Sequence, residues 1–492
     1  MMNLFLTMNK NLLIAIAVVL QLSPALAEHH ANQYHIDPSV VLKKGINKPC
    51  GAVSAWLRDS ADRRDLKPQL KELGLGALRF PGGHVSDLYL WHDIDAGSPH
   101  DGLKQKVATP HCFLANTNRW GWGINPDLSM KGDTMDFDEF METCQAIGAE
   151  PLVVVNVLSY KYKKGPTLDK LVKTAAQWVK YAKEKGYKVG YWQIGNEIDH
   201  HRDIISRDEY LEVYQRFVRA MKAEDPTIKT SFGIIGRADY YREFLKASKD
   251  EGLVDFLSAH QYLHNISDKM TTYEDWSNFN GRLAYNIPTV VRFSKQYGNL
   301  PILITETNAW GKRELLEGRA TNDWGKSLCW FDLLMELVVA PNVQCAYYWS
   351  TTNLWNRGKN GPSELCFALI DDEGAFTNRA YVSKLVNDFA VGDLIKTNSQ
   401  NKKQPVFAFH NKNKNEINLL ISNKKGTSVP MEYFVKGVAE GATFNLKTLS
   451  AKSPGDFDHT KTKHKLKTDN GSLSVQLPPF SINAININLE KK

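Results

Sequence analysis

The chain has 492 residues, of which 42% are hydrophobic and 23% are charged. These values indicate an ordinary globular protein with one large and one smaller domain, and they exclude a small scaffold that depends on disulfide bonds. The formal net charge of +7 is uneven, because residues 396–492 hold 16 Lys or Arg against 7 Asp or Glu. This basic end is either a solvated surface or a weak attractant for an anionic polymer. Nucleic acid is not an expected partner, since no Arg-rich reading element is present.

Residues 1–27 have the order of a secretory signal. Lys10 is followed by the apolar run Leu12–Leu20 and then by Ala25–Ala27, after which cleavage is expected. The alternative is an apolar first helix of the fold. No later segment approaches the roughly 20 apolar residues that a membrane span requires. The mature protein is therefore expected to be secreted or periplasmic.

Between residues 66 and 350, short β-branched runs alternate with amphipathic helical runs, which predicts parallel β/α units. Helices are expected near 137–147, 168–186, 211–221, 238–250, 282–297 and 325–339. Strands are expected at 51–56, 78–80, 151–158, 189–194, 230–235, 254–260, 301–305 and 343–349. Eight such units predict a closed (β/α)₈ TIM barrel over residues 28–390. A doubly wound sheet is the competitor, but Gly82 and Gly83 follow a proline and open no helix, unlike a phosphate-binding turn.

The pattern changes near residue 391. Short alternating runs such as "VFAFH", "INLLIS", "MEYFV", "SLSVQL" and "INAININ" are separated by Lys, Asn and Gly, without helical periodicity. This pattern predicts a C-terminal antiparallel β-sandwich domain over residues 391–492.

The predicted strand ends carry polar and aromatic side chains. In a barrel of this kind those ends open on one face, where active sites lie. The residues found there are Arg79, Asn156, Asn196, Glu197, His260, Tyr262, Glu306 and Trp349. Glu197 and Glu306 follow the fourth and seventh strands, so both carboxylates can face one pocket.

Two carboxylates at one opening suit the cleavage of a glycosidic bond. One donates a proton to the leaving oxygen, while the other meets the oxocarbenium-like carbon. Arg79 and Tyr262 are expected to stabilise a charged Glu306. Glu197 is then the expected proton donor, in apolar and aromatic surroundings that hold its proton. Asn196 is expected to bind a sugar hydroxyl, and His260 either supports Glu306 and the sugar or is structural.

Further aromatic residues lie in the long segment 84–134 and after the eighth strand. They are Tyr89, Trp91, Phe113, Trp120, Trp122 and Trp355, with Arg357 beside the last. Such rings either stack on sugar faces or pack on the C-terminal domain, and Trp91 is expected to bind substrate. The adjacent pairs His29–His30 and His200–His201 lack the spacing of metal ligands and are expected to face solvent. No metal or cofactor is expected.

The motifs "LRFPGG", "AEPLVVVNV", "YWQIGNE", "SAHQY" and "ITETNAW" stand in this order over residues 70–350. Together they resemble the clan A retaining glycoside hydrolases, most closely the α-L-arabinofuranosidases of glycoside hydrolase family 51. The resemblance implies a covalent glycosyl-enzyme mechanism with Glu197 as acid/base and Glu306 as nucleophile. It also implies carboxyl groups about 5 to 5.5 Å apart.

Two departures from that family concern the substrate. His84 stands where the family usually has Asn, and Trp310 comes four residues after Glu306 instead of directly after it. The same resemblance fits an endo-acting β-glycanase, an agarase or a β-glucuronidase or heparanase-like enzyme. An inverting hydrolase and a glycan-binding protein without turnover are the remaining alternatives. The expected partner is a polysaccharide or oligosaccharide, of plant or algal origin in the leading hypothesis.

Overall fold

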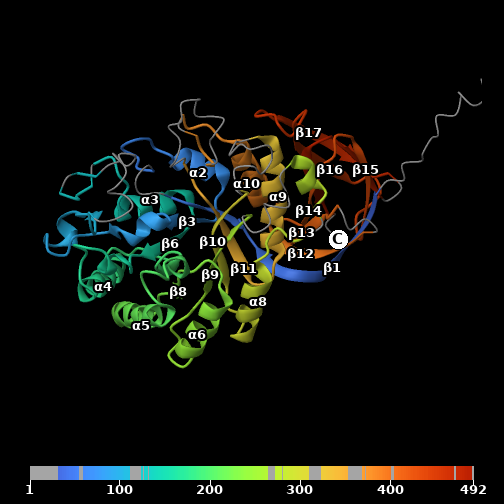
Figure 1. Cartoon of the computed structure of the whole chain (residues 1–492). Helices are drawn as coiled ribbons and strands as arrows, with labels where there is room; N and C mark the ends of the chain where they lie inside the picture. Colours follow the sequence, from blue (N-terminus) through green and yellow to red (C-terminus); the bar gives the residue numbers. More distant parts are fainter. Residues whose placement is uncertain are drawn as a thin grey trace, which may run out of the picture.

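The computed structural model contains a parallel β/α barrel with a β domain beside it (Figure 1). It describes residues 32–54, 59–110, 124–125, 127–130, 132–263, 272–279, 281–309, 323–352, 368–371, 373–399, 404–469 and 472–489. The expected signal at residues 1–27 lies outside this described part.

In the described residues, the barrel sheet has eight parallel strands in the order β8-β7-β6-β3-β2-β11-β10-β9. Their bounds are β2 Cys50–Val53, β3 Ala77–Phe80, β6 Glu150–Val155, β7 Tyr191–Ile194, β8 Thr230–Phe232, β9 Leu257–Tyr262, β10 Ile302–Asn308 and β11 Val343–Tyr348. The segment that follows β8 contacts the other edge strand, β9, since the His260 N–H donates to the Ile235 carbonyl at 2.8 Å. The predicted eight-stranded barrel is therefore confirmed and nearly closed.

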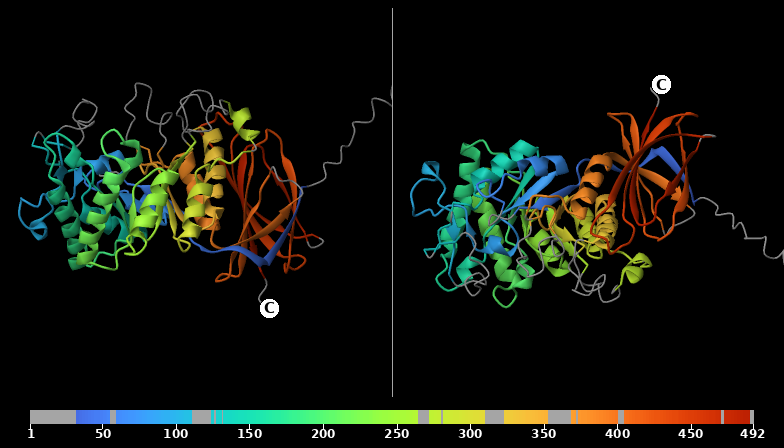
Figure 2. Two further views of the ribbon diagram at one scale, coloured as in Figure 1. Left: turned by 60° about the horizontal axis from the view of Figure 1, so that its bottom comes forward. Right: turned by 90° about the horizontal axis from the view of Figure 1, so that it is seen from above.

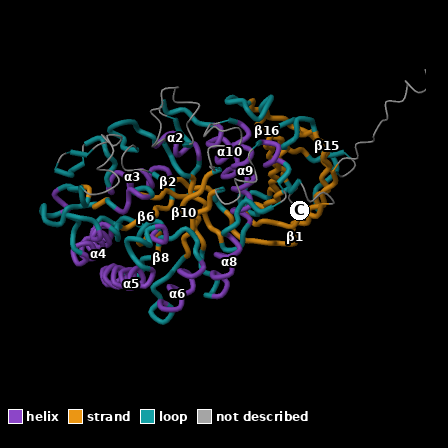
Figure 3. The backbone as a smooth tube through the Cα atoms, viewed as in Figure 1, coloured by secondary structure: helices purple, strands orange, loops and turns teal. Residues whose placement is uncertain are grey.

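Helices surround the barrel strands (Figure 3). Their bounds are α2 Lys67–Leu73, α3 Phe137–Ile147, α4 Leu168–Glu184, α5 Arg207–Glu224, α6 Ala238–Ser248, α7 Tyr273–Ser277, α8 Ile287–Gln296, α9 Trp324–Val339 and α10 Asn378–Phe389. Each predicted helix is present, although α8 begins five residues later than expected because Pro288 occupies its first turn. Among the described residues, no helix combines the length and apolar composition that a bilayer crossing demands.

The β domain is one nine-stranded sheet in the described part of the chain, in the order β17-β16-β19-β14-β13-β12-β1-β15-β18. Its strands are β1 Asn32–Ile46, β12 Gly392–Ser399, β13 Phe407–Asn411, β14 Glu416–Asn423, β15 Val429–Val435, β16 Thr443–Ser450, β17 Thr460–Lys467, β18 Leu473–Leu477 and β19 Ser481–Asn488. Its two halves share one apolar core, as in a sandwich. The pairing is antiparallel except between β1 and β15.

The predicted domain boundary is wrong at the N-terminal side. Residues 28–390 were assigned to the barrel, but β1 pairs with β12 and β15 and so belongs to the β domain (Figure 2). Tyr34 and Ile36 of β1 are buried in the core of that domain. The β domain is thus assembled from both ends of the chain.

The helices α9 and α10 lie between the barrel and the β domain (Figure 1). The Trp324 indole N–H at the start of α9 donates to the Phe480 carbonyl at 2.6 Å. At the other end of α9, the Lys43 ammonium of β1 donates to the carbonyls of Val338, Ala340 and Val343, at 2.6, 2.9 and 2.6 Å. A cation there satisfies terminal carbonyl groups and complements the helix dipole.

Lys43→Met should therefore destabilise the protein. The change removes a charged donor from three carbonyls, so we expect the free energy of unfolding to fall by about 2 kcal/mol. Denaturant unfolding measures this loss, with the exposed neighbour Lys44→Met as the control, for which a change below about 0.5 kcal/mol is expected. Equal stability of the two variants would contradict the assigned role of Lys43.

Candidate active site

Glu197 is turned into the barrel opening by a tight turn after β7. Gly195 has a φ of 84°, and a Cβ on it would lie 2.8 Å from side-chain carbons of both Ile198 and Val157. Glu197 itself has the left-handed φ and ψ of 48° and 36°. This conformation costs a non-glycine residue roughly 1–2 kcal/mol, and the Ile198 N–H bond to the Gly233 carbonyl (3.0 Å) helps to hold it. Such strain is typical of functional positions.

Glu306 is directed into the same opening by a bulge in β10. Ile304 pairs with Ala259 of β9, but the next pair is Glu306 with His260, so β10 has one extra residue between the two pairs. A bulge re-aims the side chains that follow it. The Glu306 side chain is 6% exposed and therefore almost inaccessible to solvent.

Arg79 of β3 joins the two strand ends. Its fully buried guanidinium donates to Glu306 Oε1 at 2.7 Å and to Asn196 Oδ1 at 2.6 Å. The Tyr262 hydroxyl donates to the other Glu306 oxygen at 2.9 Å. Burial and the nearby Glu306 raise the pKa of Tyr262 well above its usual value, so the phenol remains a donor. The expected contacts of Arg79 and Tyr262 with Glu306 are thus present.

Glu197 is surrounded by three imidazoles. His260 Nδ1 lies 2.7 Å from Glu197 Oε1, and His84 Nε2 and His200 Nδ1 lie 3.2 and 3.3 Å from Glu197 Oε2. The sequence had indicated apolar surroundings for this residue, and that expectation is wrong. His200 follows Glu197 by three residues, a spacing that places both side chains on one side of the short helix η5 (Ile198–His200).

The imidazoles reverse the expected effect of burial on Glu197. Burial alone would raise the pKa of this carboxyl, but the hydrogen bonds from His200 and His260 and the charges of His260 and His84 bring the pKa well below its usual value. The hydrogen bond to Glu197 raises the pKa of His200 in turn. A proton in this cluster therefore resides on an imidazole, with Glu197 charged.

The two carboxylates are close enough to act on one bond. One oxygen of Glu197, one oxygen of Glu306 and a ring nitrogen of His260 lie within 4.8 Å of one another. His260 Nδ1 lies between the carboxylates, 2.7 Å from Glu197 and 3.6 Å from Glu306. His84, Asp87 and His201 form a second cluster whose atoms are close enough to hold a metal ion.

Gly83 and Trp349 form the wall beside Glu306. A Cβ on Gly83 would lie 2.7 Å from Glu306 Oε1 and 2.9 Å from the Trp349 ring. Only a glycine therefore lets the chain pass here without moving the carboxylate. Trp349 is half-buried, and its carbonyl accepts a hydrogen bond from Asn308 at 2.6 Å.

Other predicted site residues have different environments. Asn156 is buried, and its side-chain amide donates to the Tyr89 carbonyl at 3.3 Å and accepts from the Ser159 N–H at 3.2 Å. Trp91 was expected to bind substrate, but it is 1% exposed and its indole N–H donates to the Thr174 carbonyl. It stacks on Trp178 in the core, so that prediction is wrong.

The prediction that His200 and His201 only face solvent is also wrong. His200 contacts Glu197, and His201 lies edge-to-face against His84 with ring centroids 5.6 Å apart. The remaining predicted residues lie outside the described residues: His29, His30, Phe113, Trp120, Trp122, Trp310, Trp355 and Arg357.

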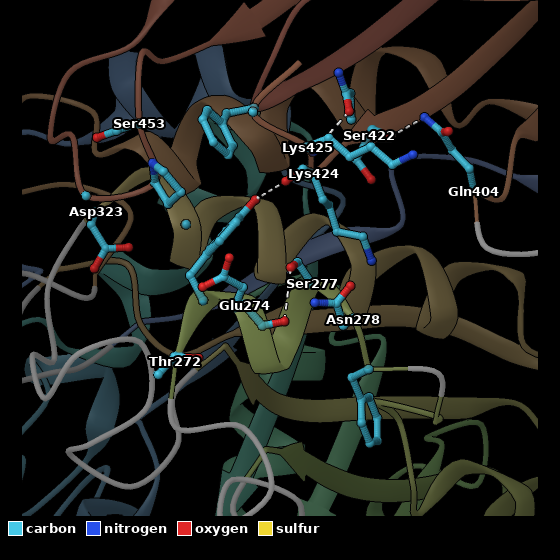
Figure 4. Close-up of a pocket in the computed structure, with 18 of the residues that line it drawn as sticks. Thr272, Glu274, Ser277, Asn278, Asp323, Gln404, Ser422, Lys424, Lys425 and Ser453 are labelled. Carbon is cyan, nitrogen blue, oxygen red and sulfur yellow. Dashed lines mark hydrogen bonds between the residues drawn. The ribbon is translucent and has the colours of Figure 1, made fainter. Parts of the chain in front are cut away.

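A separate cavity of about 960 Å³ lies between the barrel and the β domain (Figure 4). Its lining includes Tyr273 of α7, Asp323 before α9, and Lys424 and Phe480 of the β domain. The Tyr273 hydroxyl donates to the Lys424 carbonyl across this junction at 2.8 Å. Neither Glu197 nor Glu306 lines this cavity, so it is distinct from the carboxylate site.

Comparison with known proteins relates the barrel to carbohydrate-active enzymes. Residues 69–281 match the family model described as alpha-L-arabinofuranosidase 1 domain. A relative from Aspergillus fumigatus, named probable alpha-L-arabinofuranosidase C, is 29% identical over 200 residues, which are 36% of this chain and 34% of that protein. An intracellular exo-alpha-L-arabinofuranosidase from Bacteroides ovatus is 26% identical over 185 residues, or 33% of this chain and 31% of that one. The chain thus spans about a third of the length of these relatives.

The whole fold has a counterpart among solved structures. The alpha-L-arabinofuranosidase of Thermotoga maritima, solved with arabinose, superimposes with a TM-score of 0.68 at 18% identity and covers 93% of this chain and 100% of that one. This likeness extends over both the barrel and the β domain. Together with the family match and the positions of Glu197 and Glu306, these findings confirm that the chain resembles the clan A glycoside hydrolases of the family 51 type.

Proposed function

We propose that this protein is a retaining glycoside hydrolase, similar to the α-L-arabinofuranosidases, that cleaves plant or algal polysaccharide or oligosaccharide. One observation carries the proposal. Two buried carboxylates from the ends of β7 and β10 lie with oxygens within 4.8 Å of each other, and they have different partners. A short separation suits a direct attack by one carboxylate, whereas an inverting enzyme needs room for a water between them.

In the first step Glu306 is the nucleophile. Arg79 and Tyr262 orient its oxygens, and the guanidinium balances its charge. A Glu306 oxygen forms a bond to the anomeric carbon while the glycosidic C–O bond breaks, and the leaving oxygen takes a proton from Glu197. In the second step Glu197 accepts a proton from water, whose oxygen displaces Glu306 from the sugar.

The proton for the first step comes from the Glu197–His200 pair. The pKa of His200 is raised and that of Glu197 is lowered, so the resting pair stores its proton on the imidazole. His200 is largely exposed, at 59% of its side chain. A sugar bound at the opening excludes water and favours the neutral form of the pair, in which Glu197 carries the proton.

The arabinoside type of substrate rests on the match of residues 69–281 and on the names of the relatives. The export of the enzyme rests on the apolar run Leu12–Leu20 and the small residues before Glu28. An exported hydrolase meets polymeric glycans outside the cell. The proposal requires no cofactor, because both steps use only side chains of the protein and water.

A panel of aryl glycosides and polysaccharides tests the activity and identifies the sugar. Glu306→Ala should abolish turnover, whereas Glu197→Ala should lose about 10²–10⁴-fold in kcat/KM only with poor leaving groups, because good ones need no proton. The surface variant Glu251→Ala serves as the control. Proton NMR of the first product should show the retained anomer. Glycan binding with no product from the unaltered protein would refute the proposal in favour of a binding protein.

The pH profile of His200→Ala tests the stored proton. In the wild type the pair keeps its proton up to the raised pKa of His200, and activity falls above it. Without His200 the pKa of Glu197 rises, because one of the hydrogen bonds that lower it is lost, but His260 and His84 still hold it below the raised pKa of His200. The basic limb of kcat/KM should therefore move to lower pH. The exposed His464→Ala should leave the limb in place. A shift to higher pH would mean that His200 only stabilises the Glu197 charge.

Gly83→Ala tests the fit of the wall beside Glu306. Its methyl group would occupy space within 3 Å of Glu306 and Trp349, so one of them must move. We expect kcat to fall by about 10²-fold, the effect of an ångström-scale misplacement, with an unchanged melting temperature. Gly455→Ala, whose Cβ would meet only Ser453 at 3.9 Å, should retain full activity. A wild-type kcat in Gly83→Ala would contradict this prediction, because it would show that the methyl group is accommodated without misplacing Glu306.

A further inference from the structure

We propose that His84, Asp87 and His201 form a binding site for a divalent transition-metal ion of the Zn²⁺ type at the edge of the active site. One ligand atom of each residue lies within 4.8 Å of the others. His84 and Asp87 are the first and last residues of the short helix η1 (His84–Asp87), so their side chains project on the same side. His201 directly follows η5, and its ring lies edge-to-face against that of His84 with centroids 5.6 Å apart.

The strongest evidence is the state of Asp87. Its side chain is 2% exposed, and neither carboxylate oxygen accepts a hydrogen bond of normal geometry from the described residues. His201 Nε2 is also buried without such a partner in that part of the chain. Burying a carboxylate that lacks partners is costly. Glu197 and Glu306 lie nearby and add to this cost, which a contact with the Asn196 backbone N–H and the charge of Arg79 offset only in part.

A cation between these side chains would remove that cost. Two imidazoles and one carboxylate are the donor set of Zn²⁺ and similar ions, whereas Ca²⁺ and Mg²⁺ favour oxygen ligands alone. Bonds of about 2.0–2.1 Å around a tetrahedral ion place the ligand atoms roughly 3.4 Å apart. Atoms within 4.8 Å reach that spacing by a small side-chain movement. The His84 side chain is 49% exposed, which leaves space around it for such a movement.

The site would also be linked to Glu197. His84 Nε2 lies 3.2 Å from Glu197 Oε2, and an imidazole nitrogen that binds a metal cannot donate to a carboxylate at the same time. The sequence does not reveal this cluster, since His201 is far from His84 and Asp87 in the chain and the fold brings them together. The inference does not depend on the proposed glycosidase activity.

Titration calorimetry of the metal-free, full-length protein with ZnCl₂ tests the proposal. We expect one site with a Kd of about 10 µM or below. Asp87→Asn and His201→Ala should each weaken binding by at least about tenfold. His100→Ala is the matched control. The His100 side chain is 49% exposed, as is that of His84, and it also lies beside a carboxylate, 3.0 Å from Glu184. This control should keep the wild-type affinity.

A second measurement separates folding from binding. Zn²⁺ should raise the melting temperature of the wild type and of His100→Ala, but not that of His201→Ala. If Asp87→Asn does not fold, His201→Ala alone tests whether the cluster binds Zn²⁺, since His201 is only half-buried and its replacement should leave the fold intact. Equal Zn²⁺ affinity in wild type and His201→Ala, or no binding by the wild type, would overturn the proposal.

Discussion

The site depends on the buried guanidinium of Arg79. Arg79 lies near the end of β3 and donates to Glu306 near the end of β10 and to Asn196 after β7. A buried cation must be paired, because its desolvation cost is several kcal/mol. Arg79 can meet this requirement only when three separate strand ends are correctly placed. The arrangement of the barrel strands that pairs Arg79 is therefore also the arrangement that positions the carboxylates.

The two carboxylates differ in their donors and not in their burial, since both are nearly inaccessible. Glu306 is held by Arg79 and by Tyr262, and burial and the nearby Glu306 raise the pKa of that phenol well above its usual value. Glu197 is held by three imidazoles, of which His200 has a raised pKa because of its hydrogen bond to Glu197. The two carboxyl groups therefore differ in their donors, and Glu197 shares a proton with His200. An apolar pocket at this depth would have more difficulty in keeping a proton on Glu197, because Arg79 already places a positive charge in the site.

The regular part of this fold could be predicted from the sequence, because apolar periodicity reports burial in strands and helices. The strand-end residues Arg79, Glu197, His260, Tyr262 and Glu306 follow from that reading, since parallel strands end on one face. β12, β16 and β17 are not among the predicted C-terminal runs; β17 leaves no apolar period because its alternating Lys residues are largely exposed. The assignment of β1 to the β domain was missed because pairing across the chain ends has no local signal.

The irregular loops account for the errors at the site. Trp91 was placed at the opening because aromatic residues in long loops often bind sugar, whereas here the loop folds back and buries Trp91 against α4. His200 and His201 were placed in solvent because adjacent polar residues do not reveal the direction of a turn. The left-handed turn at Glu197 decides that direction, and it brings both histidines toward the opening. Glu306 is held by the strand residues Arg79 and Tyr262, whereas Glu197 is held by His260 of β9 and also by His84 and His200 of two short helices that follow strands. The part of the site that the sequence did not reveal is therefore the part that surrounds Glu197.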